Sequence, residues 1–275
     1  MNCPHDIAAV IPESQLIFLC PHYDDVPLTF GGYLAELRRA GVLKRKKIRI
    51  VNVFSRSNYQ ARDVAGNADV SLRRTQFATG IRLLEDWNCL DELLGHGAYD
   101  YQLLRERECV LRSKSWKPGE KFEFPQGNRR TFDAEDWEIF LRLRKRCAEW
   151  LKQRDTAVLA LLGVKEHVDH IIVREALATA CQKLESDRRA TVYFGEEQPY
   201  TGLADKRDRE LMARTMRRFQ LMPRDYLIGE RGMGFYYAAM ALNFERLSIG
   251  SVAMTRRFFR ELVAYVRGAC IDGQP

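Results

Sequence analysis

The chain has 275 residues, 46% of them hydrophobic and 29% charged, and its formal net charge is +7. These values are typical of a globular protein with one large core or two small ones. No stretch reaches the roughly 18 to 20 apolar residues of a membrane helix, and residues 1–10 hold no apolar run of signal-peptide length. We therefore expect a cytoplasmic protein with no membrane span. The seven cysteines are scattered without a C-x-x-C pair, which argues against a disulfide framework and a zinc ribbon.

The first predicted elements form a β-α-β unit. Leu16 to Leu19 is an apolar run of strand type, and Phe30 to Ala40 has helical periodicity that ends at Gly41, a C-cap residue. Ile48 to Phe54 predicts the second strand. Such a unit implies a parallel strand pair with a right-handed crossover.

Helices and strands continue to alternate along the chain. Further helices are predicted over Val70 to Leu84, Asp133 to Arg154, Val168 to Leu184, Lys206 to Phe219 and Ser251 to Gly268, and further strands over Thr156 to Leu162 and Thr191 to Phe194. The segment from Asp86 to Arg130 shows no clear pattern, and we interpret it as an insertion that forms part of a lid over the carboxyl edge of the sheet. The chain therefore predicts one α/β domain: a Rossmann-like, mostly parallel sheet with helices on both faces, a loop-rich insertion at 86–130 and a helical C-terminal extension over 201–275.

Histidines and aspartates cluster where two of these strands end. The first strand runs into Pro21-His22-Tyr23-Asp24-Asp25, with the pair Gly31-Gly32 a few residues later. The strand that begins at Thr156 is followed by His167-Val168-Asp169-His170, so three of the five histidines lie in these two loops. Open α/β sheets bind ligands at the carboxyl ends of their strands, and we therefore expect the two loops to form one site.

The residue types in the two loops are those of a metal site. His22, Asp25 and His170 would supply two imidazole nitrogens and one carboxylate oxygen and leave a position open for water, as catalytic zinc sites do. The same donors suit Fe²⁺, Co²⁺ and nickel. Asp24 is placed to take the proton of a water whose pKa the metal lowers. The alternative is that these residues only cap helices and form turns, as Asp often does.

Other polar residues near the same edge are candidates for substrate contacts. His167 would polarise a carbonyl or stabilise an oxyanion, oriented by Asp169; it could instead be a fourth metal ligand or a surface residue. Arg73 or Arg74 could hold sugar hydroxyls or a phosphate, with a solvated helix face as the alternative. Ser55 and Asn58 could line the pocket, with an ordinary loop as the alternative.

The motifs resemble those of the PIG-L/LmbE-like N-deacetylases, zinc-dependent enzymes with a Rossmann-like sheet that remove acetyl groups from amino sugars and their glycosides. The family motif (A/S)-H-P-D-D-E corresponds to Pro21-His22-Tyr23-Asp24-Asp25-Val26, and H-P-D-H corresponds to His167-Val168-Asp169-His170. The family's R-x-x-E helix corresponds to Arg73-Arg74-Thr75-Gln76. Val26 and Gln76 replace the two glutamates, and the resemblance covers roughly residues 15–200.

The resemblance implies a role for each matched residue. The zinc ligands would be His22, Asp25 and His170, with Asp24 as general base, His167 stabilising the oxyanion and Asp169 supporting it. The general acid stays open between Asp24 and His167. The partner would be a small N-acetylated sugar or glycoside.

Two other classes of function remain to be compared with this one. A non-catalytic metal- or glycan-binding protein could retain the same site, although such a protein has no need of a base such as Asp24. The net positive charge could favour nucleic acid, but no finger, RRM or zipper pattern accompanies it, and we expect no nucleic-acid partner.

Overall fold

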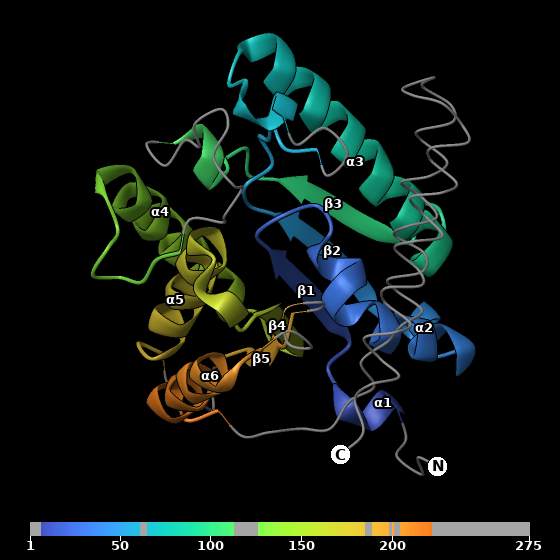
Figure 1. Ribbon diagram of the computed structural model, residues 1–275. Helices are drawn as coiled ribbons and strands as arrows, with labels where there is room; N and C mark the ends of the chain where they lie inside the picture. Colours follow the sequence, from blue (N-terminus) through green and yellow to red (C-terminus); the bar gives the residue numbers. More distant parts are fainter. Residues whose placement is uncertain are drawn as a thin grey trace.

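The computed structural model describes residues 7–60, 65–112, 126–184, 189–197, 200 and 204–221. Within them, parallel strands form one sheet in the order β3-β2-β1-β4-β5 (Figure 1). The strands are β1 Gln15–Cys20, β2 Lys47–Asn52, β3 Tyr99–Leu103, β4 Thr156–Leu161 and β5 Thr191–Gly195. β1 lies at the centre, where Leu19 pairs with Val51 of β2 and Ala160 of β4.

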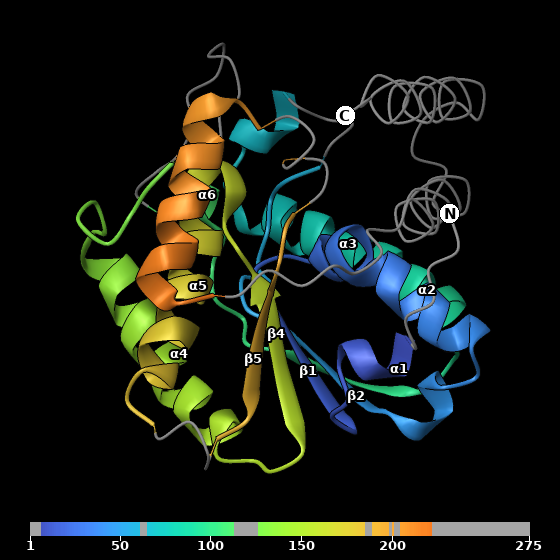
Figure 2. The ribbon, with the colours of Figure 1, turned by 90° about the horizontal axis from the view of Figure 1, so that it is seen from below.

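Helices cover both faces of this sheet. They are α1 Ile7–Val10, α2 Gly31–Arg39, α3 Leu72–Leu94, α4 Ala134–Leu151, α5 Val168–Cys181 and α6 Lys206–Phe219. Figure 2 shows α4, α5 and α6 on one side of the sheet and α1, α2 and α3 on the other. The predicted α/β class, with a parallel sheet between two helical layers, is confirmed.

The core consists of two apolar layers, one on each face of the sheet. In β1, Ile17 and Leu19 pack with the layer that contains α4 and α5, whereas Leu16 and Phe18 pack with the layer that contains α2. Both faces of β1 are therefore buried, which explains why its sequence is a continuous apolar run rather than an alternating one.

The region from Asp86 to Arg130 differs from the predicted insertion. α3 continues to Leu94, and Tyr99–Leu103 forms β3, an edge strand that pairs with β2. The first part of this region thus belongs to the sheet and to the helix that precedes it. β3 escaped prediction because its side chains are partly exposed and form no apolar run, and the helical pattern of α3 is obscured by the buried polar Asp86. Residues 113–125 lie outside the described part of the chain.

In the C-terminal part, α6 has the predicted bounds, whereas the helix predicted at 251–268 lies outside the described residues. Among the described helices, none combines the length and the apolar character needed to cross a membrane.

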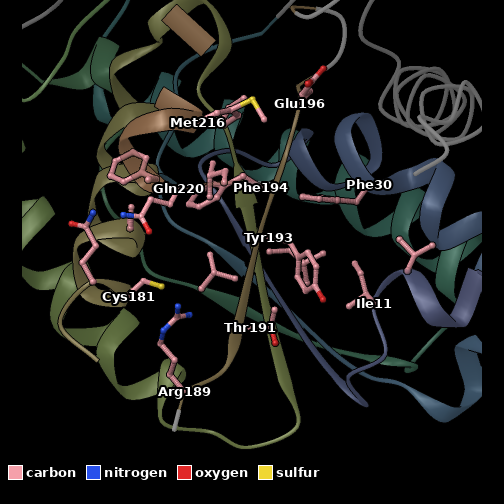
Figure 3. A pocket seen from close by; sticks show the side chains of 18 of the residues that line it. Ile11, Phe30, Cys181, Arg189, Thr191, Tyr193, Phe194, Glu196, Met216 and Gln220 are labelled. Atoms are coloured by element: carbon pink, nitrogen blue, oxygen red, sulfur yellow. The ribbon is translucent and has the colours of Figure 1, made fainter. Parts of the chain in front are cut away.

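A cavity of about 570 Å³ lies along the edge strand β5 (Figure 3). Ile11 and Phe30 line it on one side of the strand and Cys181 and Met216 on the other, and the described residues that line it include none of the predicted His and Asp site residues.

Candidate active site

The two loops rich in His and Asp meet at one edge of the sheet. β1 and β4 are neighbours and run parallel, so the loops that follow them leave the sheet side by side. Nε2 of His170 consequently lies 3.2 Å from Nδ1 of His22. β1 and β4 also flank the point where the strand order reverses, which is where open α/β sheets bind ligands.

Asp25 completes a group of three residues whose potential metal-ligand atoms lie close together. Its Oδ2 lies 3.7 Å from Nδ1 of His22, and its Oδ1 lies 3.7 Å from Nε2 of His170. All three side chains are buried. Ligand atoms around a tetrahedral zinc ion with bonds of ~2.0–2.1 Å are about 3.4 Å apart. The separations therefore fit a divalent ion held by these three residues.

Each of the two imidazoles has a buried carboxylate on its other nitrogen. Nε2 of His22 lies 3.1 Å from Oδ2 of Asp169, and Nδ1 of His170 lies 3.0 Å from Oε1 of Glu197. Metal-binding histidines are typically held in this way, because the carboxylate keeps the proton on the outer nitrogen and leaves the inner one with its lone pair. The surroundings of both histidines thus also fit a metal site.

The electrostatics of the site favour a positive charge. Burial by itself would lower the pKa of His22, but the hydrogen bond with Asp169 and the nearby carboxylates of Glu108 and Asp25 raise this pKa to about 9. Burial raises the pKa of Asp25 to about 6, although His170 and His22 oppose the rise. A cation among these groups, whether a proton or a metal ion, offsets the repulsion between the carboxylates.

His167 lies against both other histidines, with its ring centre 4.9 Å from each of theirs. Burial, reinforced by His170 and His22, lowers the pKa of His167 well below its usual value. Its Nδ1 accepts a hydrogen bond from the backbone N–H of Asp169 at 3.2 Å. The neutral ring therefore carries its proton on Nε2, where it can donate a hydrogen bond; Sγ of Cys109 lies 3.9 Å from this nitrogen.

Asp24 lies at the more open side of the group, and 29% of its side chain is exposed. Its carboxylate lies close to the potential metal-ligand atoms: one such atom each from His22, Asp24 and Asp25 all lie within 4.8 Å of one another. Nη2 of Arg82 donates a hydrogen bond to Oδ1 of Asp24 at 3.4 Å, and the same guanidinium is bonded to the buried Glu108. This arrangement holds Asp24 beside the cluster while leaving it accessible.

Asp169 is the centre of a buried network behind the histidines. Its Oδ1 accepts a hydrogen bond from Nη2 of Arg112 at 2.6 Å, and its Oδ2 accepts one from the backbone N–H of Cys109 at 3.0 Å. Burial opposes ionisation, but Arg112 and the hydrogen bond with His22 hold the pKa of Asp169 well below its usual range. We expected Asp169 to orient His167; in the structure its carboxylate contacts His22, and its backbone N–H bonds to His167.

The four residues predicted to bind substrate lie near the loop that follows β2. Ser55 and Asn58 are buried, and Nδ2 of Asn58 donates a hydrogen bond to the carbonyl of Asn67 at 2.6 Å. Nε of Arg74 donates to the carbonyl of Asn58 at 3.1 Å, whereas Arg73 is exposed. These contacts hold the loop itself together, and a role of the four residues in substrate binding stays a prediction.

Four charged residues that no sequence motif singles out belong to the same network: Arg82, Glu108, Arg112 and Glu197. Glu108 and Arg112 lie in the segment that we interpreted as an insertion. Glu197 follows the end of β5, at the same edge of the sheet as the two motifs, and this strand-end position is the signal that could have identified it.

The chain matches no family model and no curated protein. Among solved structures it is similar to A40926 pseudoaglycone deacetylase Dbv21, at 17% identity over 86% of this chain and 84% of that one, with a TM-score of 0.52. The chain shares its fold with Dbv21. Weaker similarity connects it with the zinc-inhibited form of teicoplanin deacetylase Orf2, at 18% identity over 75% of this chain and 84% of that one and a TM-score of 0.49. N,N′-diacetylchitobiose deacetylase from Pyrococcus horikoshii follows, at 15% identity over 89% and 84% and a TM-score of 0.39.

Proposed function

We propose that the protein is a metal-dependent hydrolase that removes the acetyl group from an N-acetylated amino sugar or a sugar-containing small molecule. The observation that carries this proposal is the convergence of His22, Asp25 and His170 from two strand ends, with Asp24 at the accessible side. The motifs shared with the PIG-L/LmbE-like family and the deacetylase activity named for Dbv21, which has the same fold, support the same reaction.

His22, Asp25 and His170 would hold the divalent ion. Zinc is the first expectation because two imidazoles and one carboxylate are a common catalytic zinc set, although Fe²⁺ or Co²⁺ also suits these donors. When bound, such an ion supplies a water of lowered pKa and polarises the carbonyl of the substrate.

The remaining steps are assigned to protein side chains. Asp24 would accept a proton as the water oxygen attacks the acetyl carbon. Nε2–H of His167 would donate a hydrogen bond to the oxyanion that forms on the acetyl oxygen. The C–N bond then breaks as a proton returns to the amine, and acetate is released. We assign this last transfer to Asp24, because this carboxylate has just accepted the proton of the attacking water and can pass it on.

Metal content tests the centre of the proposal. Protein purified without added metal should contain about one divalent ion per chain by elemental analysis, and His170→Ala should lose it. Acetate release from N-acetylglucosamine derivatives should stop after chelation and return with Zn²⁺. If the wild-type protein holds no stoichiometric ion, or His170→Ala hydrolyses at the full rate, the proposal is wrong.

Asp24→Asn tests the base. This variant should keep its metal but lose about 10²–10⁴-fold in turnover. Asp100→Asn is the control, because its side chain is 77% exposed on the edge strand β3 and should not affect activity. Undiminished turnover in Asp24→Asn would refute the assignment. If the metal-loaded wild type binds N-acetylated sugars but hydrolyses none of them, the protein is a sugar-binding protein and not a hydrolase.

A further inference from the structure

Glu197 lies just beyond β5, and its side chain is buried beside the loop between β4 and α5. Its Oε1 accepts hydrogen bonds from the backbone N–H groups of Gly163, at 2.6 Å, and Val164, at 3.1 Å. The same oxygen lies 3.0 Å from Nδ1 of His170. One carboxylate therefore connects the beginning of this loop with the histidine that follows it.

The backbone of this loop is strained. Gly163, Lys165 and Glu166 have φ angles of 80°, 66° and 55°, in the left-handed region that side chains other than glycine rarely adopt. The space is also tight, because a Cβ on Gly163 would lie 2.8 Å from Cδ1 of Ile171. Such a conformation persists only where the surroundings hold it. The two hydrogen bonds from the backbone to Glu197 hold it at its first residues.

We propose that Glu197 is a positioning residue of the candidate metal centre. It keeps His170 in the tautomer with the proton on Nδ1, so that Nε2 faces His22 and Asp25 with its lone pair, and it holds the strained loop that delivers His170 to this place. The inference rests on the proposed function, because it takes His170 as a metal ligand.

The chemistry of a carboxylate explains why this position needs Glu. An ionised carboxylate can only accept hydrogen bonds, so the neutral ring of His170 must present N–H at Nδ1 and keep Nε2 unprotonated. A glutamine of the same size carries an NH₂ group that can donate to Nδ1. The opposite tautomer, with the proton on Nε2, then becomes available and cannot bind a metal through that nitrogen.

Glu196 supplies a matched control. It is the adjacent residue and also a glutamate, but it lines the cavity along β5 (Figure 3), and none of the described residues that line this cavity is a histidine. Glu196→Gln therefore removes the same charge from the same segment without touching the candidate metal centre.

The test compares the zinc affinity of the full-length wild type, Glu197→Gln and Glu196→Gln. Each protein is stripped of metal and titrated with Zn²⁺ against a competing chelator, and urea unfolding of the stripped proteins is followed separately. We expect Glu197→Gln to weaken zinc binding by about 10- to 100-fold and Glu196→Gln to leave it within about twofold of the wild type. Imidazole ¹⁵N shifts of the zinc-loaded wild type should show His170 protonated on Nδ1.

The outcomes separate this inference from the proposed function. If the wild type binds zinc and Glu197→Gln binds it equally well, the positioning role is refuted while the function stands. If His170 of the zinc-loaded wild type lacks a proton on Nδ1, the role is refuted without reference to any variant, even where Glu197→Gln fails to fold. If the wild type binds no divalent ion, the proposed function fails.

Discussion

Replacement of Arg112 would leave two buried carboxylates without their shared cation. The side chains of Arg112, Asp136 and Asp169 are all fully buried. Nη2 of Arg112 lies 3.1 Å from Oδ1 of Asp136 and 2.6 Å from Oδ1 of Asp169. The guanidinium also packs 4.9 Å from the ring centre of Phe54. Arg112→Met keeps much of this packing and removes the charge.

We expect Arg112→Met to lower the free energy of unfolding by about 3–5 kcal/mol, because removing one partner of a buried ion pair leaves an uncompensated charge in a low-dielectric interior. The pH dependence follows from the pKa of Asp169, which lies well below its usual range in the folded protein. The aspartate of the unfolded chain titrates near ~3.9, so ionised Asp169 stabilises the fold above about pH 4, and this stabilisation is lost as the pH falls further. The deficit of Arg112→Met should therefore be largest near neutral pH and shrink as the pH falls, because Asp169 without its guanidinium binds a proton more readily.

Urea unfolding of the metal-stripped proteins, followed by circular dichroism, measures this deficit. Arg142→Met is the control, because Arg142 is 52% exposed and its ion pair with Glu106 should contribute no more than about 1 kcal/mol. Adding Asp169→Asn to Arg112→Met should recover part of the loss. The reasoning is refuted if Arg112→Met loses less than about 1 kcal/mol, or if its deficit is as large at low pH as at neutral pH.

Two further predictions concern stability. Burial, reinforced by Asp24, raises the pKa of Asp86 well above its usual value despite the hydrogen bond from Tyr101. The folded protein thus retains a proton that the unfolded chain loses, and the free energy of unfolding falls as the pH rises above about 4, by up to about 1.4 kcal/mol per pH unit. Asp86→Asn should remove this loss, which urea unfolding at pH 7 measures. A variant less stable than the wild type at this pH would contradict the prediction. Gly163→Ala should lower the free energy of unfolding by about 1–3 kcal/mol, because its φ angle is positive and a Cβ there would meet Ile171. Gly80→Ala in α3 is the control: a Cβ at Gly80 meets nothing within 4 Å, so this variant should be neutral or stabilising. If the two variants change the free energy of unfolding equally, the loop at Gly163 is not strained.

The α/β class and the position of the candidate site at the carboxyl edge of the sheet follow from local sequence patterns. β1 and β4 are buried on both faces, so each is a continuous apolar run that any hydrophobicity pattern reveals. Polar loops that follow such strands meet at one edge of a parallel sheet, and for this reason the sequence predicts that His22 and His170 lie close together. The chemical roles of these residues stay predictions.

The partners of these residues depend on the three-dimensional arrangement of the strands and cannot be inferred from local patterns. β3 is an edge strand with half-exposed side chains and no apolar run, so its place beside β2 depends on the sheet that receives it. Arg112 meets Asp169, and Glu197 meets His170, across 57 and 27 positions of sequence. Contacts of this kind leave no local pattern, because they depend on which strands are adjacent and on the depth at which a charge is buried rather than on the neighbours of a residue along the chain.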